Sequence, residues 1–287
     1  MRAYLPNYEM RTPRRLEDAL DLLARESGVW KPFAGGTDLM VLFEAGKLDH
    51  KHYLNLWPLR ELKGIEVADG VVIIGGLTTY TQIQANEVLR EEFSMLCQAA
   101  SETGGWAIQN RGTLAGNIAN ASPAADSPPA LLAYNAEIEL VSSTGSRMVD
   151  YKDFHLGYKQ TVMRPDEIIS KIRIPRATKS VKTYYRKVGT RKAQAISKVC
   201  FAGAIKFDGA KIEDIRIALG SIAPVPLRCV KTESLVRGVR LDHEIIERAK
   251  TELQNEIIPI NDIRSTALYR NRVAINLLED FLVQNGI

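Results

Sequence analysis

Two glycine-bearing segments constrain this chain more than any other feature of its sequence. The first, residues 34–39, reads Ala-Gly-Gly-Thr-Asp-Leu and follows a short apolar run that ends at Phe33. The second, residues 109–126, contains Gly112 and Gly116 among small hydrogen-bonding residues and holds few large apolar side chains. We therefore expect the second segment to be a loop outside the core. A single Gly-Gly pair is common in ordinary turns. Two such segments are hard to explain as turns alone, so they favour a ligand site.

In the first segment, Gly35 and Gly36 allow either a positive φ or the close approach of a partner. Thr37 is expected to cap the helix that follows and to leave its first amide groups free. A helix start of that kind binds a pyrophosphate without help from a cation. The alternative is a tight strand-to-helix turn that binds nothing.

The composition excludes several functional classes. The 287 residues include 38 Lys+Arg and 34 Asp+Glu, a net charge of +4 with no basic block, so nucleic-acid binding is not expected. The chain has no apolar run of about 18 residues and no signal peptide, so we expect no membrane span and a cytoplasmic location. The cysteines Cys97, Cys200 and Cys229 form no Cys-x-x-Cys pattern, and His50 and His52 supply only two ligands. We predict buried thiols and no metal site.

Turn signals and apolar periodicity predict an α+β chain of two domains. A polar stretch after Pro175 is the expected linker, which gives domains of residues 1–176 and 177–287. The second domain is expected to hold a three-stranded meander followed by helices, and Thr12 and Pro13 are expected to begin the first helix. The expected helices are 16–23, 80–90, 93–102, 127–134, 242–254 and 266–284, and the expected strands are 29–33, 53–56, 65–74 (a hairpin), 137–141, 166–174, 183–188, 199–207 and 212–219.

Sequence motifs for several kinds of site are missing. The chain has neither Gly-x-Gly-x-x-Gly nor the Gly-x-x-x-x-Gly-Lys phosphate loop, and it lacks Gly-x-Ser-x-Gly. No acid–base pair stands out, so we assign no catalytic residue. If the protein is an enzyme, its reactive group is a bound cofactor that the chain positions.

Six motifs spread along the chain carry a family resemblance. They are Ala34-Gly-Gly-Thr-Asp-Leu39, Ile74-Gly-Gly-Leu-Thr-Thr79, the segment from Thr113 to Asp126, Tyr185-Arg-Lys-Val-Gly-Thr-Arg191, Ala223-Pro-Val-Pro-Leu-Arg228 and Tyr269-Arg270. Together they resemble the FAD-binding subunit of molybdenum hydroxylases, the family that includes xanthine dehydrogenase and carbon monoxide dehydrogenase. The resemblance covers essentially the whole chain.

The resemblance implies a vanillyl-alcohol-oxidase-type (PCMH) FAD-binding domain with two subdomains, followed by the smaller C-terminal domain of such flavoproteins. It also implies that the first segment wraps the FAD pyrophosphate and that the second holds the phosphate, ribose and adenine side. The residues that it places at the cofactor are Phe33, Ala34, Gly35, Gly36, Thr37, Asp38, Leu39, Thr113, Gly116, Asn117, Ser122, Asp126, Ile168, Ile169 and Lys187.

Two of these assignments leave an alternative open. Asp126 suits a ribose hydroxyl, yet it also stands where it could cap a helix that begins at Ser127. Lys187 equally suits a solvated position on a strand. The chain departs from the family pattern at Ala115, where glycine is common, and at Gln194, where an acidic residue is common. The methyl group of Ala115 is tolerated unless its φ is positive, and Gln194 leaves access of the electron acceptor open.

Neither glycine segment contains His or Cys, so we expect the FAD to be non-covalent. The resemblance further implies an electron-transfer subunit that receives electrons from the 2Fe-2S clusters of a small partner and passes them to NAD or another acceptor. Substrate oxidation would then belong to a large molybdopterin subunit. Two alternatives stand beside this hypothesis: a self-contained FAD-dependent oxidase or reductase that acts on a small substrate, and a non-catalytic assembly module whose glycine segments are turns.

Overall fold

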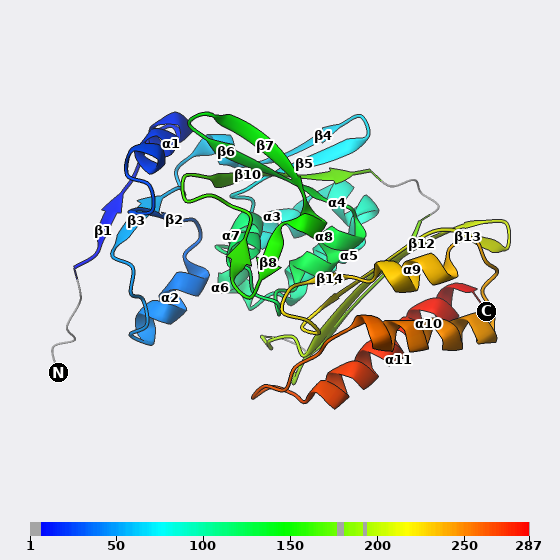
Figure 1. Ribbon diagram of the computed structural model, residues 1–287. Coiled ribbons are helices and arrows are strands. Elements are labelled where there is room, and N and C mark those ends of the chain that lie inside the picture. The colour runs from blue at the N-terminus through cyan, green and yellow to red at the C-terminus, as the bar shows by residue number, and fades with distance from the viewer. Residues whose placement is uncertain (1–6, 177–180, 192–193, 287) are drawn as a thin grey trace.

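Three β-sheets of three or more strands, each with its own helices, follow one another along the described part of the chain (Figure 1). The computed structural model describes residues 7–176, 181–191 and 194–286. The first sheet is parallel, with the order β1-β3-β2, and the first glycine segment is the connection from its strand β2 to helix α2. The elements of this subdomain are β1 (Glu9–Arg11), α1 (Leu16–Arg25), β2 (Lys31–Phe33), α2 (Thr37–Glu44) and β3 (His52–Asn55).

The residues that precede both helices in this subdomain differ from the predicted caps. Helix α1 begins after Arg15, because the Thr12 hydroxyl accepts a hydrogen bond from Asn55 on β3 at 3.3 Å instead of capping the helix. Helix α2 is preceded by Gly36, whose φ of 76° lies in the left-handed region. Thr37 is therefore the first helical residue and makes no cap. Glycine takes this conformation without the steric cost of a Cβ atom.

The second sheet is antiparallel and has the order β4-β5-β10-β6-β7. The Asp69-Gly70 turn joins β4 to β5, as the sequence predicts. Helices α3 to α8 connect β5 to β6, and α5 and α8 lie between this sheet and the C-terminal one (Figure 1). The bounds are β4 (Ile65–Ala68), β5 (Val71–Gly75), α3 (Tyr80–Ala85), α4 (Glu87–Glu92), α5 (Ser94–Glu102), α6 (Trp106–Gln109), α7 (Leu114–Ala119), α8 (Ser127–Ala133), β6 (Glu137–Ser142), β7 (Gly145–Asp150) and β10 (Ile168–Pro175), with a separate hairpin of β8 (His155–Gly157) and β9 (Gln160–Thr161).

The second glycine segment is only partly a loop, so that expectation is wrong. It contains α7, whose Leu114 and Ile118 are fully buried. The Thr113 hydroxyl caps this helix by accepting a hydrogen bond from the Gly116 amide at 3.1 Å. The helix expected at 80–90 is likewise divided, since Asn86 ends α3 and its side chain caps α4.

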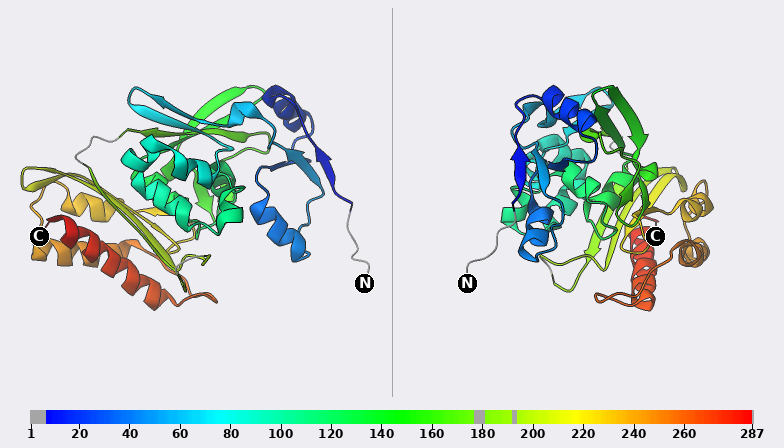
Figure 2. Two further views of the ribbon diagram at one scale, coloured as in Figure 1. Left: turned by 180° about the vertical axis from the view of Figure 1, so that it is seen from behind. Right: turned by 60° about the vertical axis from the view of Figure 1, so that its left-hand side comes forward.

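The C-terminal sheet is antiparallel in the order β11-β12-β13-β14, with one short strand more than the predicted meander. Helices α9, α10 and α11 cover its outer face, at the end of the molecule opposite to α2 (Figure 2). No described helix has the length and apolar character that crossing a bilayer requires. The bounds are β11 (Lys182–Val188), β12 (Val199–Asp208), β13 (Lys211–Gly220), β14 (Leu227–Arg228), α9 (Val230–Val236), α10 (His243–Glu256) and α11 (Ala267–Gly286).

Strand β12 is buried on both faces, and its side chains alternate in size. Val199 and Phe201 face the core under α11, whereas Cys200, Ala202 and Ala204 belong to the core shared with the first domain. Successive residues of a strand point to opposite faces, so the small residues form a single surface. That surface lets α8 pack closely against the sheet.

A buried ion pair joins the two domains. Lys187 Nζ on β11 lies 2.7 Å from Asp126 Oδ2, just before α8, and also donates to the Glu102 carbonyl at 2.7 Å. The lysine side chain is only 6% exposed, so it is not the solvated strand residue that the sequence left possible. Burial raises the pKa of Asp126 to about 6, although Lys187 lowers it. The desolvation of the carboxylate thus raises its pKa by more than the attraction of the lysine lowers it.

Replacing Lys187 with Met should destabilise the fold in a pH-dependent way. The buried carboxylate then lacks its cation, and we expect the free energy of unfolding to fall by about 3–5 kcal/mol near pH 8. The pKa of Asp126 is already above its unfolded value, and a raised folded pKa costs stability as the pH rises through it. The loss should therefore be smaller near pH 5, where the carboxyl takes up a proton. Urea denaturation at the two pH values measures both changes.

Lys206→Met is the matched control. Lys206 forms an ion pair of the same 2.7 Å length with Glu213, but on the more exposed β12–β13 hairpin. Its loss should cost less than about 1 kcal/mol. The double variant Asp126→Asn with Lys187→Met should be more stable than Lys187→Met alone. A Lys187→Met variant that loses no more than the control would show that the buried pair does not join the domains.

Candidate cofactor site

The two glycine segments meet backbone to backbone. A Cβ atom at Gly35 would lie 1.8 Å from the Arg111 carbonyl oxygen, so only glycine permits this contact. The Arg111 guanidinium in turn stacks over the Trp57 ring at 3.8 Å. On the other side, Asn120 Nδ2 donates to Asp38 Oδ1 at 3.1 Å. The structure thus brings together two regions that are separated by more than seventy positions in the sequence.

The first segment presents a run of free amide groups. None of the backbone N–H groups of residues 35–39 donates to an acceptor within the described ranges. A Cβ at Gly36 would lie 2.4 Å from the Phe33 ring, so the ring packs directly beneath the turn. Free N–H groups at a helix start attract anions. The predicted residues Phe33, Ala34, Gly35, Gly36, Thr37, Asp38 and Leu39 form this turn.

The second segment faces it with polar groups of its own. Asn117 follows Gly116 on α7, and its Oδ1 atom is buried without a hydrogen-bond partner in the described chain. Ala121, just after the helix, has a φ of 48°, which is strained for a residue with a side chain. Ser122 accepts a hydrogen bond from the Ala124 amide at 3.3 Å. An unpartnered buried oxygen next to a strained turn is the arrangement that a bound ligand would satisfy.

The motif at residues 74–79 supports the second segment. The amides of Ala115 and Leu114 donate to the carbonyls of Gly76 and Thr78 at 3.2 and 3.0 Å. A Cβ at Gly76 would lie 2.4 Å from the Ile169 carbonyl oxygen, so this glycine is also required by a close contact. The side chains of Ile168 and Ile169 are buried in the core, and their predicted contact with a cofactor remains a prediction.

Asp126 and Lys187 lie together at the end of the second segment. Asp126 precedes α8 but makes no side-chain hydrogen bond to its amides, so the capping alternative does not describe it. One carboxylate oxygen binds Lys187, and the other, Oδ1, is buried without a partner in the described chain. Its backbone carbonyl accepts from the Tyr185 hydroxyl at 3.0 Å. This oxygen is therefore a hydrogen-bond acceptor that no described group satisfies.

The structure shows the conformation of the two residues that depart from the family pattern, Ala115 and Gln194. Ala115 lies within α7 and is not among the described residues with a positive φ, so its methyl group is tolerated. Gln194 has a φ of 51°, and its carbonyl accepts from the Arg191 guanidinium at 2.6 Å. Its side chain rests close to Gly105, before α6.

None of the predicted site residues is a histidine or a cysteine, although Cys200 Sγ lies 3.9 Å from the Asp126 carbonyl oxygen. His50 contacts the Val29 carbonyl at 2.9 Å, and His52 is 3.8 Å from Glu9. Cys200 and Cys229 are buried, as predicted, whereas Cys97 is half-buried. Among the described residues no group of three His, Cys, Asp or Glu side chains could hold a metal ion.

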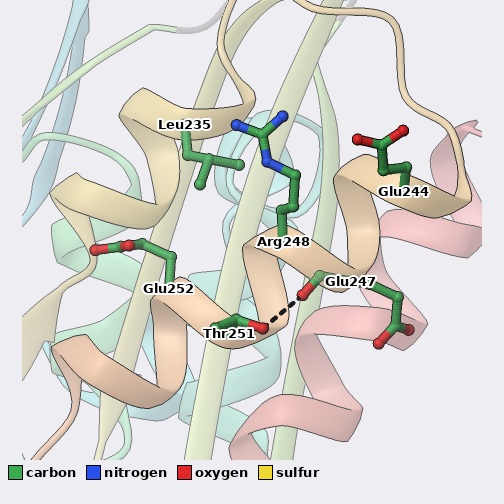
Figure 3. A pocket seen from close by; sticks show the side chains of 6 residues that line it. All are labelled: Leu235, Glu244, Glu247, Arg248, Thr251 and Glu252. Atoms are coloured by element: carbon green, nitrogen blue, oxygen red, sulfur yellow. Dashed lines mark hydrogen bonds between the residues drawn. The ribbon is translucent and has the colours of Figure 1, made fainter.

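A surface hollow of about 410 Å³ lies elsewhere, between α9 and α10 (Figure 3). None of the predicted site residues lines it. Thr251 donates to the Glu247 carbonyl within its wall. The lining residues are Leu235, Glu244, Glu247, Arg248, Thr251 and Glu252.

Two residues at the site were missed by the sequence analysis. Asn120 lies inside the second segment but had no assigned role, and Lys159 lies on the β8–β9 hairpin, which was not predicted at all. Lys159 Nζ donates to Asn120 Oδ1 at 2.5 Å. Only the tertiary fold brings this hairpin to the glycine segments, so no local sequence signal could have found Lys159.

The residues present fit an FAD. Free amides and a glycine turn suit its diphosphate, and the unpartnered oxygens of Asn117 and Asp126 suit its hydroxyl or amino groups.

Comparisons with known proteins identify the family of this chain. Residues 6–177 match the family model described as the FAD binding domain in molybdopterin dehydrogenase, and residues 184–284 match the carbon monoxide dehydrogenase flavoprotein C-terminal domain. The glyceraldehyde dehydrogenase medium chain of Sulfolobus acidocaldarius is 32% identical over 270 residues, which cover 94% of this chain and 95% of the relative. The xanthine dehydrogenase FAD-binding subunit of Escherichia coli O157:H7 is 32% identical over 257 residues, or 89% of this chain and 88% of the relative.

A solved structure shows the same fold. Carbon monoxide dehydrogenase from Hydrogenophaga pseudoflava contains a chain that is 25% identical, with a TM-score of 0.92 and 96% of both chains covered. The chain described here therefore belongs to the molybdenum hydroxylase family, as its FAD-binding oxidoreductase subunit of the xanthine and carbon monoxide dehydrogenase type.

Proposed function

We propose that this subunit holds FAD non-covalently between its two glycine segments and carries electrons from a partner's 2Fe-2S clusters to NAD or another acceptor. The observation that supports it most is the run of free amides at residues 35–39, which lies against the second segment. Several relatives are named as a medium chain or an FAD-binding subunit, and these names describe one component of a larger enzyme.

Each predicted residue has a proposed task at the cofactor. The amides of the first segment bind the diphosphate, and Gly116 lets the Thr113 cap of α7 approach closely, since a Cβ there would lie 2.8 Å from the Thr113 hydroxyl. Asn117 and Asp126 offer their free oxygens to hydroxyl or amino groups. Lys187 fixes the orientation of Asp126 through their ion pair. Thr113 and Ser122 hold the second segment in shape through their hydrogen bonds, and the buried Ile168 and Ile169 pack behind the cofactor.

The chain's contribution is to bind and orient, and no general base in it is needed. FAD exchanges electrons singly or in pairs, which suits transfer between iron–sulfur clusters and a two-electron acceptor. The proposed partners are a small subunit with 2Fe-2S clusters and a large subunit with molybdopterin, where substrate oxidation would occur. Carbon monoxide dehydrogenase medium chains are among the relatives and support this division of labour.

We place the boundary between the two domains after residue 176. Strand β10 ends at Pro175 and β11 begins at Lys182, so the connection falls between two different sheets. The two family models also leave a gap there, between residues 177 and 184. The FAD-binding domain would then be 1–176 and the C-terminal domain 177–287.

Gly35→Ala should weaken FAD binding by at least about tenfold. The added methyl group would overlap the Arg111 carbonyl, so the two segments must separate. Gly46→Ala is the control, because Gly46 has a positive φ of 65° but nothing within 4 Å of a Cβ. It should lose only about 1 kcal/mol of stability through backbone strain. Titration of the apoprotein followed by flavin fluorescence measures both affinities, and equal dissociation constants would contradict the proposed site.

Acid precipitation should release all of the flavin into the supernatant. Residues 33–39 and 113–126 offer neither a histidine nor a cysteine for a covalent link. Mass spectrometry of the supernatant should identify FAD. Flavin that stays with the precipitated protein would refute non-covalent binding, and a colourless protein that takes up no added FAD would favour an assembly module.

The isolated subunit should not oxidise an aldehyde or a purine by itself. Its flavin absorbance should bleach on addition of reduced nicotinamide if NAD is the acceptor, or on addition of a purified iron–sulfur partner that has been reduced beforehand. Anaerobic absorbance spectra measure these reactions. Bleaching by a small organic substrate with this subunit alone would instead support a self-contained oxidase or reductase.

A further inference from the structure

Three segments from different parts of the chain meet at Lys159. This residue occupies the tip of the β8–β9 hairpin, and its Nζ atom donates to Asn120 Oδ1 at 2.5 Å. Asn120 donates through Nδ2 to Asp38 Oδ1 at 3.1 Å. The hairpin is thereby linked to the second glycine segment and, through it, to the first.

The two segments, residues 34–39 and 109–126, contain one cation, Arg111, and its guanidinium stacks over the Trp57 ring at 3.8 Å. They also include the acids Asp38 and Asp126. The diphosphate of FAD carries two negative charges, and backbone amides supply only partial positive charge. Lys and Arg side chains strengthen an anion site through charge-assisted hydrogen bonds. Because the Arg111 guanidinium is held against Trp57, a cation from another element would add to the attraction that the amides provide.

Lys159 carries a positive charge that no acidic side chain fully compensates. It forms no ion pair within 4.0 Å among the described residues. Burial lowers its pKa, Asp38 raises it and Lys31 lowers it. Its charge is thus only partly compensated, and an anion at the junction of the segments would be attracted to it.

The backbone also holds Lys159 in a costly conformation. Its φ is 57°, a region that residues with a side chain rarely adopt. The tight turn between β8 and β9 accounts for this φ, because short hairpin turns require positive φ values. The turn fixes the position of Lys159, whose side chain reaches Asn120.

We propose that Lys159 is a cofactor-binding residue that contributes a full positive charge to the diphosphate of FAD. This inference rests on the proposed function, since it requires FAD to lie between the glycine segments. Asn120 positions the ammonium group, and Asp38 orients the Asn120 amide. Lys159 then supplies electrostatic attraction, while the amides of residues 35–39 supply directional hydrogen bonds.

The test compares three variants of the full-length chain after removal of flavin. Lys159→Met removes the charge, Lys159→Arg keeps it, and Lys152→Met removes a charge from the same region that is paired with Asp150 instead. FAD is titrated into each apoprotein at low and high salt. Thermal denaturation without FAD shows whether each variant is folded.

Lys159→Met should bind FAD about tenfold more weakly at low salt, which corresponds to the loss of one charge-assisted hydrogen bond. Its affinity should also depend less on salt, because screening acts on the charge that has been removed. Lys159→Arg and Lys152→Met should resemble the unaltered chain in both affinity and salt dependence.

The outcomes separate this inference from the function on which it rests. If the unaltered chain binds no FAD, both fail. If it binds FAD while Lys159→Met keeps its affinity and salt dependence, only the role of Lys159 is refuted. A Lys159→Met variant with weaker binding but unchanged salt dependence would show that the lysine merely ties the hairpin to α7, which also overturns the inference.

Discussion

The candidate site depends on the contact between Gly35 and the backbone of Arg111. At this point two segments from different subdomains touch with no side chain between them. The free amides of the first segment and the polar groups of the second face one site only because this contact holds them together. Gly76 makes a comparably close contact with the Ile169 carbonyl oxygen, and its own carbonyl binds the Ala115 amide of the second segment. The geometry of the site therefore depends on glycines at positions where a Cβ atom would push the segments apart.

The second constraint is electrostatic. Asp126 and Lys187 are buried together at the domain junction, and neither would be stable there without the other. Because one oxygen of Asp126 remains free, the pair can join the domains and still present an acceptor to a ligand. In the proposed site, stability and binding thus share one carboxylate, so we expect a substitution at Asp126 to change both.

Local sequence patterns predicted most of the strands and the long helices, because their apolar residues repeat with the period of each element. The hairpin at Asp69-Gly70 and helix α8 after Asp126 have strong local signals of this kind. The burial of α7 could not be predicted, since its Leu114 and Ile118 are too few to give a periodic pattern.

The residues of the candidate site were predicted from the family resemblance more than from local sequence patterns. The glycine segments are visible in the sequence, but nothing local reveals that Gly35 touches Arg111 or that Asp126 pairs with Lys187. Likewise, Thr12 looks like a helix cap until the partner strand β3 supplies Asn55. Contacts of this kind depend on the packing of distant elements, and a single sequence does not encode them locally.

The alternation of large and small residues along β12 has a consequence for how this protein is built. The face with Cys200, Ala202 and Ala204 belongs to the core of the FAD-binding domain, so the C-terminal sheet covers one side of that core. Two family models describe the chain as two modules, but one core cluster draws on residues of both. Separating the modules would expose that shared apolar surface, so an exchange of the C-terminal module between relatives would have to preserve that strip of small side chains.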